Sequence, residues 1–143
     1  MGVPTDRAVI GLRSVQLSPW RMEFQHRADG GLLINDAYNA NAVSTESALR
    51  SLARVDARRR VAVLGLMAEL GDHHDDDHRA MAGLADELGI ELLAFREPAY
   101  GRPVLETFDD VVEALGELGP GVAVLVKASR VAGLERLAER LLG

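Results

Sequence analysis

The sequence contains no cysteine and only one lysine, and both features narrow the classes of protein that it can encode. Without cysteine, disulfide scaffolds, zinc ribbons and thiol catalysis are excluded. The single lysine is Lys127, since 15 of the 16 basic residues are arginines. Because this Arg-for-Lys usage is a general compositional bias, the arginines say little individually, and the one retained lysine gives a first hint of a specific role.

Long hydrophobic runs are also absent. No apolar run approaches the ~18 residues of a transmembrane helix, and residues 1–20 lack the continuous apolar segment of a signal peptide. The net charge of −6, from 16 basic and 22 acidic residues, argues against a general nucleic-acid binder. We therefore expect a soluble, cytoplasmic protein with no membrane span and no nucleic-acid partner, and a length of 143 residues favours one main domain.

Four short apolar runs recur at a spacing of roughly 30 residues, the length of a strand–helix–strand unit. They are residues 32–34, 61–64, 92–95 and 122–126, and they are almost continuously apolar, as strands buried on both faces of a parallel sheet are. Helical patterns at 48–53, 81–88, 111–118 and 134–141 alternate with them. This order predicts an α/β fold, a Rossmann-like doubly wound, mostly parallel sheet flanked by helices.

Local signals predict where several elements begin and end. Thr107 and Asp110 form a possible capping box before the third helical pattern, while Gly89 and Gly119 follow the second and third patterns as stops. Residues 20–24 could form an edge strand outside the alternation. We expect residues 1–20 to be a linker or the tail of a preceding domain, and residues 21–143 to be the domain itself.

Polar residues follow three of the predicted strands, at 35–41, 65–71 and 127–130. Ligands of open α/β sheets bind beyond the carboxyl ends of the strands, so these clusters converge on the expected ligand edge. The third cluster precedes a helix N-terminus, which favours an anion. For each residue, an ordinary role in a turn or helix cap remains an alternative.

Other motifs point away from catalysis by this chain alone. There is no P-loop, and Gly116, Gly119 and Gly121 precede a strand, where turn glycines belong, instead of following one. The run of histidines and aspartates at 73–78 has metal-ligand types without a recognisable spacing. Carboxylates in the first turn of a helix explain it better. Glu69 is either a base or a loop carboxylate.

Three segments together resemble the C-terminal domain of the Mur ligases. Residues 33–41 read L-I-N-D-A-Y-N-A-N, residues 63–71 read V-L-G-L-M-A-E-L-G, and residues 124–130 read V-L-V-K-A-S-R. The first string is long and characteristic, and it is most similar to the MurF type. The resemblance covers nearly the whole chain from about Arg21 onward, and His78 matches a family histidine whose helical position suggests a structural role.

The resemblance implies an ATP-dependent, peptidoglycan-precursor ligase of three domains, in which a central domain carries the P-loop and the third domain closes over the nucleotide. Such enzymes join D-Ala-D-Ala to UDP-MurNAc-tripeptide through an acyl phosphate, with Mg²⁺ offsetting phosphoryl charge. The implied cofactors, ATP and Mg²⁺, would be bound mainly by the domains outside this chain. We therefore expect the chain alone to be inactive, without a certain catalytic residue or metal site, and the whole protein to be monomeric.

The resemblance also implies roles for individual residues. Those expected on the nucleotide side are Arg21, Asn35, Asp36, Tyr38 and Asn39. Those expected on the substrate side are Asn41, Lys127, Ser129 and Arg130. The sequence departs from the family pattern at Trp20, Ala42, Leu66 and Ala128, where the family usually has glycine, proline, an acidic residue and glycine.

Two other interpretations remain open. A stand-alone α/β ligand-binding or interaction module fits the composition equally well but does not account for the Asn-rich string. Another Mur ligase or a folylpolyglutamate synthase-type ligase would share the fold, but we would expect a different string after the first strand.

Overall fold

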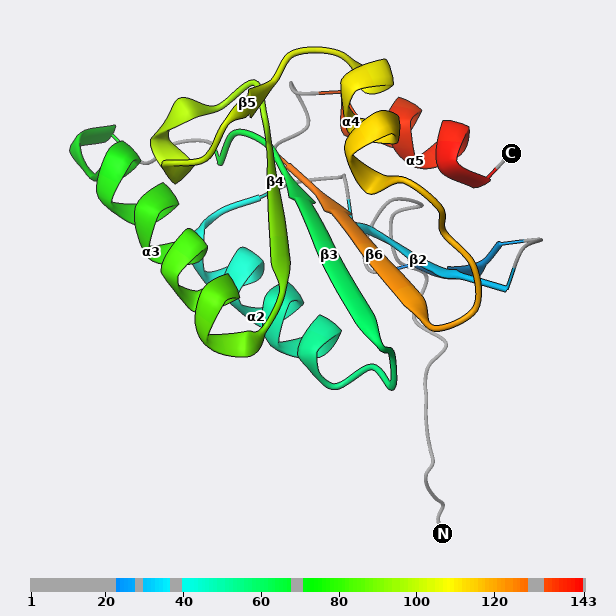
Figure 1. Cartoon of the computed structure of the whole chain (residues 1–143). Coiled ribbons are helices and arrows are strands. Elements are labelled where there is room, and N and C mark those ends of the chain that lie inside the picture. Colours follow the sequence, from blue (N-terminus) through cyan, green and yellow to red (C-terminus); the bar gives the residue numbers. More distant parts are fainter. Residues whose placement is uncertain (1–22, 28–29, 37–39, 68–70, 129–132, 143) are drawn as a thin grey trace, which may run out of the picture.

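The computed structural model describes residues 23–27, 30–36, 40–67, 71–128 and 133–142. They form one six-stranded sheet with the order β1-β2-β6-β3-β4-β5 (Figure 1). The strands are β1 (Glu23–His26), β2 (Leu32–Asp36), β3 (Arg59–Leu64), β4 (Glu91–Phe95), β5 (Val104–Leu105) and β6 (Val122–Lys127). All neighbouring strands are parallel except β1 and β2, which are antiparallel. The predicted mostly parallel α/β sheet is confirmed.

Helices cover both faces of this sheet. The described helices are α2 (Ala42–Ala53), α3 (His74–Leu88), α4 (Phe108–Leu115) and α5 (Leu134–Leu142), with short 3-10 turns η1 (Gly71–His73) and η2 (Pro98–Tyr100). One buried cluster joins α2 and α3 to alternate strand residues such as Ala123 and Leu125 of β6. The other joins α4 and α5 to the intervening residues, such as Val124 and Val126. Because successive strand side chains point to opposite faces, a strand covered on both sides must be apolar throughout, which explains the four continuous runs.

The edge strand β1 lies close to its predicted position. The expected segment was 20–24, and the strand is Glu23–His26, paired antiparallel with β2. Residues 20–22 lie outside the described residues. Phe24 remains 53% exposed on this strand, and the antiparallel strand at the edge of an otherwise parallel sheet is a common arrangement.

Helix boundaries follow the local signals except at one end. Gly89 ends α3 in the left-handed conformation, and the Thr107–Asp110 capping box is formed at the start of α4. The predicted stop at Gly119 is wrong, because α4 ends at Leu115 and Gly116 follows with φ 67° and ψ −145°. Leu118 is still buried from the loop beyond the helix. Helical spacing therefore reported the burial of Leu118 correctly but not its secondary structure.

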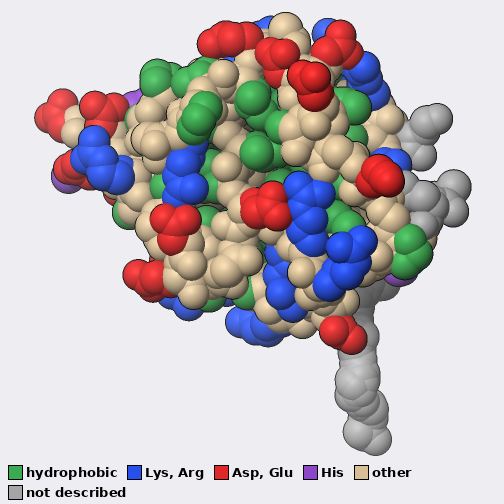
Figure 2. Space-filling model, in the orientation of Figure 1, with side chains coloured by type: hydrophobic (Ala, Val, Ile, Leu, Met, Phe, Trp, Pro, Cys, Tyr) green, Lys and Arg blue, Asp and Glu red, His purple; other side chains and the backbone are tan. Residues whose placement is uncertain are grey.

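The surface has mixed charge. Figure 2 shows acidic side chains along the upper edge of the visible face and basic side chains gathered in its lower half. The exposed acidic residues of α4 contrast with the exposed Arg54 and Arg58, which lie near the amino end of β3. Within the part of the chain that the structure describes, no helix is long and apolar enough to cross a membrane.

Candidate functional site

The strand order brings the carboxyl ends of β2 and β6 side by side. The chain leaves β2 toward α2 on one face of the sheet, whereas it leaves β6 toward α5 on the other face. Neighbouring parallel strands whose connections depart to opposite faces form a topological switch point, where open α/β sheets bind ligands. The carboxyl ends of β3 and β6 meet at the upper edge of the sheet in Figure 1. This edge is the candidate site.

A buried ion pair bridges the two strands at this switch point. Asp36 and Lys127 are partners in the β2–β6 register, and the Lys127 Nζ donates a hydrogen bond to the Asp36 Oδ2 at 2.8 Å. Their side chains are only 9% and 2% exposed. Burying both charges costs solvation free energy that their attraction must offset, so such pairs are weak evidence of stability alone. The single lysine of the chain therefore lies at the carboxyl edge of the sheet, where open α/β sheets bind ligands.

Two further predicted residues, Asn35 and Asn41, lie at the end of β2 and at the start of α2. Asn35 is buried at 4% exposure in the penultimate position of β2. Asn41 is exposed at the start of α2, where its Oδ1 accepts a hydrogen bond from the Ser44 N–H at 2.8 Å. The Asn41 N–H donates in return to the Ser44 hydroxyl at 3.1 Å, which completes a capping box. Asn41 thus has a helix-capping role, and its predicted contact with substrate stays a prediction.

Several predicted site residues lie outside the described residues. They are Arg21, Tyr38, Asn39, Ser129 and Arg130, together with Trp20 and Glu69. Of the departures from the family pattern, Ala42 is the first residue of α2, where a proline is readily accommodated. Ala128 is fully buried beside Lys127.

The loop after β3, residues 65–67, borders this edge of the sheet. Three hydrogen bonds hold its backbone in place. The Gly65 N–H donates to the Lys127 carbonyl at 3.0 Å. The Tyr100 hydroxyl donates to the Gly65 carbonyl at 2.6 Å. The Met67 N–H donates to the His78 Nε2 at 3.0 Å. The candidate site therefore continues from the ion pair on β2 and β6 to α3 and η2.

Tyr100 was missed by the sequence analysis, as was its neighbour Glu97. Both follow β4, the one predicted strand whose following residues were not considered. Applying the carboxyl-end rule to β4 as well would have drawn attention to them. Glu97 is buried, and its Oε2 accepts from the Ala99 N–H at 2.9 Å while its Oε1 lies 3.1 Å from the His74 Nε2. Burial raises the pKa of the Tyr100 hydroxyl, which therefore remains protonated and able to donate.

The acidic run of α3 has the predicted structural role, since Asp75, Asp76 and Asp77 lie in the first turn of the helix. Nearby, ligand-type atoms of His74, His78 and Glu97 lie within 4.8 Å of one another. Both ring nitrogens of His78 already have partners, the Met67 N–H and the His74 carbonyl. This group is accordingly a hydrogen-bonded network that connects helix, loop and η2.

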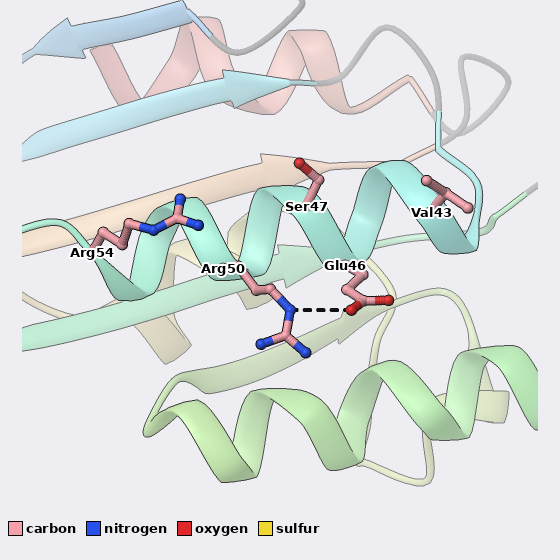
Figure 3. Close-up of a pocket in the computed structure, with 5 residues that line it drawn as sticks. All are labelled: Val43, Glu46, Ser47, Arg50 and Arg54. Carbon is pink, nitrogen blue, oxygen red and sulfur yellow. Dashed lines mark hydrogen bonds and ion pairs between the residues drawn. The ribbon is translucent and has the colours of Figure 1, made fainter.

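A shallow hollow of about 330 Å³ lies elsewhere, along the outer surface of α2 (Figure 3). Its five lining residues, Val43, Glu46, Ser47, Arg50 and Arg54, are all exposed. Arg50 and Glu46 point toward one another, with 3.1 Å between Nε and Oε2 (Figure 3). An exposed pair four residues apart on one helix contributes little free energy and marks no specific ligand. The hollow is a surface feature of α2, separate from the candidate site.

Curated relatives of this chain have a common name. A UDP-N-acetylmuramoyl-tripeptide–D-alanyl-D-alanine ligase from Mycobacterium tuberculosis (strain CDC 1551 / Oshkosh) is 36% identical over 159 residues, covering 87% of this chain and 31% of the relative. The ligase of that name from Mycobacterium leprae is 31% identical and covers 99% of this chain and 34% of the relative. The chain thus spans about a third of the length of these relatives.

Solved structures share the fold. A MurF ligase from Thermotoga maritima in complex with ADP superposes with a TM-score of 0.76 at 24% identity, over 88% of this chain and 31% of that chain. MurF from Acinetobacter baumannii gives a TM-score of 0.73 at 25% identity, over 89% and 30% of the two chains. The sequence profile of the Mur ligase, glutamate ligase domain matches residues 20–130. Since this match spans well over half of the sequence, the chain belongs to the Mur ligase, glutamate ligase domain family.

Proposed function

We propose that this chain is the C-terminal domain of an ATP-dependent ligase that joins D-Ala-D-Ala to UDP-MurNAc-tripeptide in peptidoglycan-precursor synthesis. The observation that carries the proposal is the buried Asp36–Lys127 pair at the switch point, whose two residues belong to two of the three strings that resemble the Mur ligases. The likeness to curated relatives of that name supports it. The whole protein would act in the cytoplasm as a monomer.

The nucleotide side of the domain would be formed by Asp36 and Asn35, together with Arg21, Tyr38 and Asn39. A carboxylate at the end of a strand beside a switch point can accept hydrogen bonds from ribose hydroxyls. The Lys127 ammonium keeps the Asp36 carboxylate in place for such a contact. Lys127 itself, with Asn41, Ser129 and Arg130, would face the side of the incoming D-Ala-D-Ala.

The domain would also exclude water. Transfer of the γ-phosphoryl group of ATP to the tripeptide carboxylate gives an acyl phosphate, which the D-Ala-D-Ala amine attacks with loss of phosphate. Closure of a domain over the nucleotide protects such an intermediate from hydrolysis. When bound, Mg²⁺ supplies charge neutralisation at the phosphates.

The described residues of the candidate site are poor candidates for direct ligands of Mg²⁺, because their carboxylate and imidazole groups are bonded to other side chains and backbone groups. The Asp36 Oδ2 already bonds Lys127, and the His74–His78–Glu97 network is bonded internally. We therefore assign the Mg²⁺ ligands to the rest of the protein, outside this chain.

The test is phosphate release by the full-length protein carrying this domain. With ATP, UDP-MurNAc-tripeptide and D-Ala-D-Ala, we expect release that requires both peptide substrates. Asp36→Ala and Arg21→Ala should lower it by orders of magnitude, while Glu46→Ala, which removes an exposed side chain of the α2 hollow, should not.

Other outcomes would redirect the assignment. Release with a different amine or acid would indicate another Mur ligase or a folylpolyglutamate synthase-type ligase. No release with any acceptor would favour a stand-alone binding module. The isolated chain should be inactive, because it lacks a P-loop, and ligation by it alone would contradict the fragment interpretation.

A further inference from the structure

We propose that His78 and Tyr100 are positioning residues of the ligation reaction, which hold the loop Gly65–Met67 as one wall of the candidate site. The inference rests on the proposed function and goes beyond it, because neither side chain lies at the carboxyl end of β2 or β6. Each acts through a backbone group of the loop, and together they fix the loop on both sides of Leu66.

Tyr100 holds the first half of the loop. Its side chain is 2% exposed, and its hydroxyl donates to the Gly65 carbonyl across 35 positions of sequence. The tyrosine is itself fixed by η2, whose N-cap is Glu97 and whose C-cap, Gly101, has φ 75°. A buried carbonyl that lost this donor would have to find another partner or move. The bond therefore determines where Gly65 lies.

His78 holds the second half, and its bonds define its tautomer. The His74 carbonyl can only accept, so Nδ1 carries the hydrogen and donates to it at 2.6 Å. The Met67 N–H can only donate, so Nε2 is the unprotonated nitrogen that accepts it. The ring is completely buried and contacts Tyr100 edge-on, with 4.9 Å between the centroids. Only a neutral imidazole satisfies both partners.

Burial keeps the His78 ring neutral at neutral pH, against the carboxylates that face it. Glu97 and Tyr100 face it from the η2 side, and His74 and Asp75 from its own helix. Burial lowers the pKa of His78 more than the carbonyl of His74 and the carboxylate of Glu97 raise it. Acid would place a second N–H against the Met67 N–H and release that end of the loop.

The loop is in turn continuous with the buried ion pair. The Gly65 N–H bonds the carbonyl of Lys127, the residue whose ammonium bonds Asp36. Leu66, half-buried, lies between the two fixed backbone positions. A shift of the loop is thus transmitted to the strand end that carries Lys127, and misplacement by about 1 Å can cost ~100-fold in rate.

The experiment uses the full-length protein with Tyr100→Phe, His78→Ala and His78→Gln. We expect Tyr100→Phe, which removes one hydroxyl, to lower kcat about 10- to 100-fold while the KM for UDP-MurNAc-tripeptide changes less than about twofold. His78→Gln, whose side-chain oxygen can accept the Met67 N–H, should recover part of the activity lost in His78→Ala. We expect kcat of the wild type to fall in acid as His78 is protonated, and this acid limb should be absent from His78→Gln.

The matched control is Val111→Ala, which truncates a buried residue in the core on the opposite face. It should lower Tm at least as much as Tyr100→Phe and leave kcat within about twofold. If kcat follows Tm across all four variants, or if Tyr100→Phe has wild-type kcat, the two residues are structural only and the proposal is wrong.

Hydrogen exchange separates this failure from that of the proposed function. Absence of D-Ala-D-Ala-dependent phosphate release in the wild type would overturn the proposed ligase activity, and with it the positioning role in ligation. The exchange rate of the Met67 amide would still report on the loop. Faster exchange in His78→Ala than in Val111→Ala would support the anchoring, and equal rates would contradict it.

Discussion

Two ion pairs lie at opposite ends of the same sheet, and they differ in burial far more than in geometry. At the carboxyl edge, Lys127 and Asp36 are 2.8 Å apart with side chains 2% and 9% exposed. At the amino edge, Arg59 and Glu91 are also 2.8 Å apart, with side chains 25% and 52% exposed. The distance alone would rank the pairs as equal, whereas the solvation cost makes the first expensive and the second nearly neutral.

The difference bears on function. The amino-edge pair is bidentate, because the Arg59 Nη2 also donates to the Glu91 Oε1 at 3.0 Å, and both side chains are partly exposed. A surface pair of this kind needs no functional explanation. A buried charge pair is often replaceable by apolar residues without loss of stability, so its presence at the switch point favours a functional reason.

The largest effect is expected at the buried pair. Lys127→Met should lower the free energy of unfolding by about 3–5 kcal/mol, because it leaves the buried Asp36 carboxylate without its ammonium partner. Urea denaturation of the folded full-length protein measures it. The double variant with Asp36→Asn should be more stable than Lys127→Met alone, yet remain inactive. If Lys127→Met lowers the free energy of unfolding by less than Glu91→Gln does, the contrast between the two ion pairs is wrong.

A middle-sized effect is expected at Asn41, where capping and substrate contact compete as explanations. Asn41→Ala should cost about 1 kcal/mol, since it removes the acceptor for the Ser44 N–H. Asn41→Asp keeps an acceptor at the cap and should retain the stability. If Asn41→Asp also retains the KM for D-Ala-D-Ala, capping is sufficient to explain the residue, whereas a raised KM supports the predicted substrate role.

The smallest effect is expected at the exposed pair. Glu91→Gln should lower stability by about 0.2–1 kcal/mol at pH 7, the range of exposed pairs. The hydrogen bond from Arg59 lowers the pKa of Glu91 in the folded state. The contribution is therefore present above the unfolded pKa and is lost as pH falls through the folded pKa. Denaturation at pH 7 and pH 3 should show the variant and the wild type converging in acid, and a constant difference would contradict this origin.

Much of the fold could be predicted because its signals are local. The four apolar runs became β2, β3, β4 and β6, since a strand covered on both faces needs no distant information to be recognised. Thr107 and Asp110 formed their capping box for the same reason. The end of α4 could not be predicted, because Leu118 is buried by the core and not by the helix.

The candidate site was only partly predictable. Asp36 and Lys127 were identified individually, one from its string and the other also from its rarity, but their contact across 91 positions was not. Tyr100 and Glu97 were missed because a short segment after a strand carries no periodic pattern. His78 was expected to be structural, yet its specific partner, the Met67 N–H, depends on how α3 packs.

By itself the sequence determined the alternation of strands and helices, the ligand edge and the family resemblance, because hydrophobic periodicity, caps and motifs act over a few residues. Only the tertiary structure decided that β6 lies between β2 and β3, and hence that Lys127 meets Asp36 and that the Gly65 N–H meets the Lys127 carbonyl. Strand order follows from which faces and registers bury the most apolar surface together, a property of the whole chain that no local segment contains.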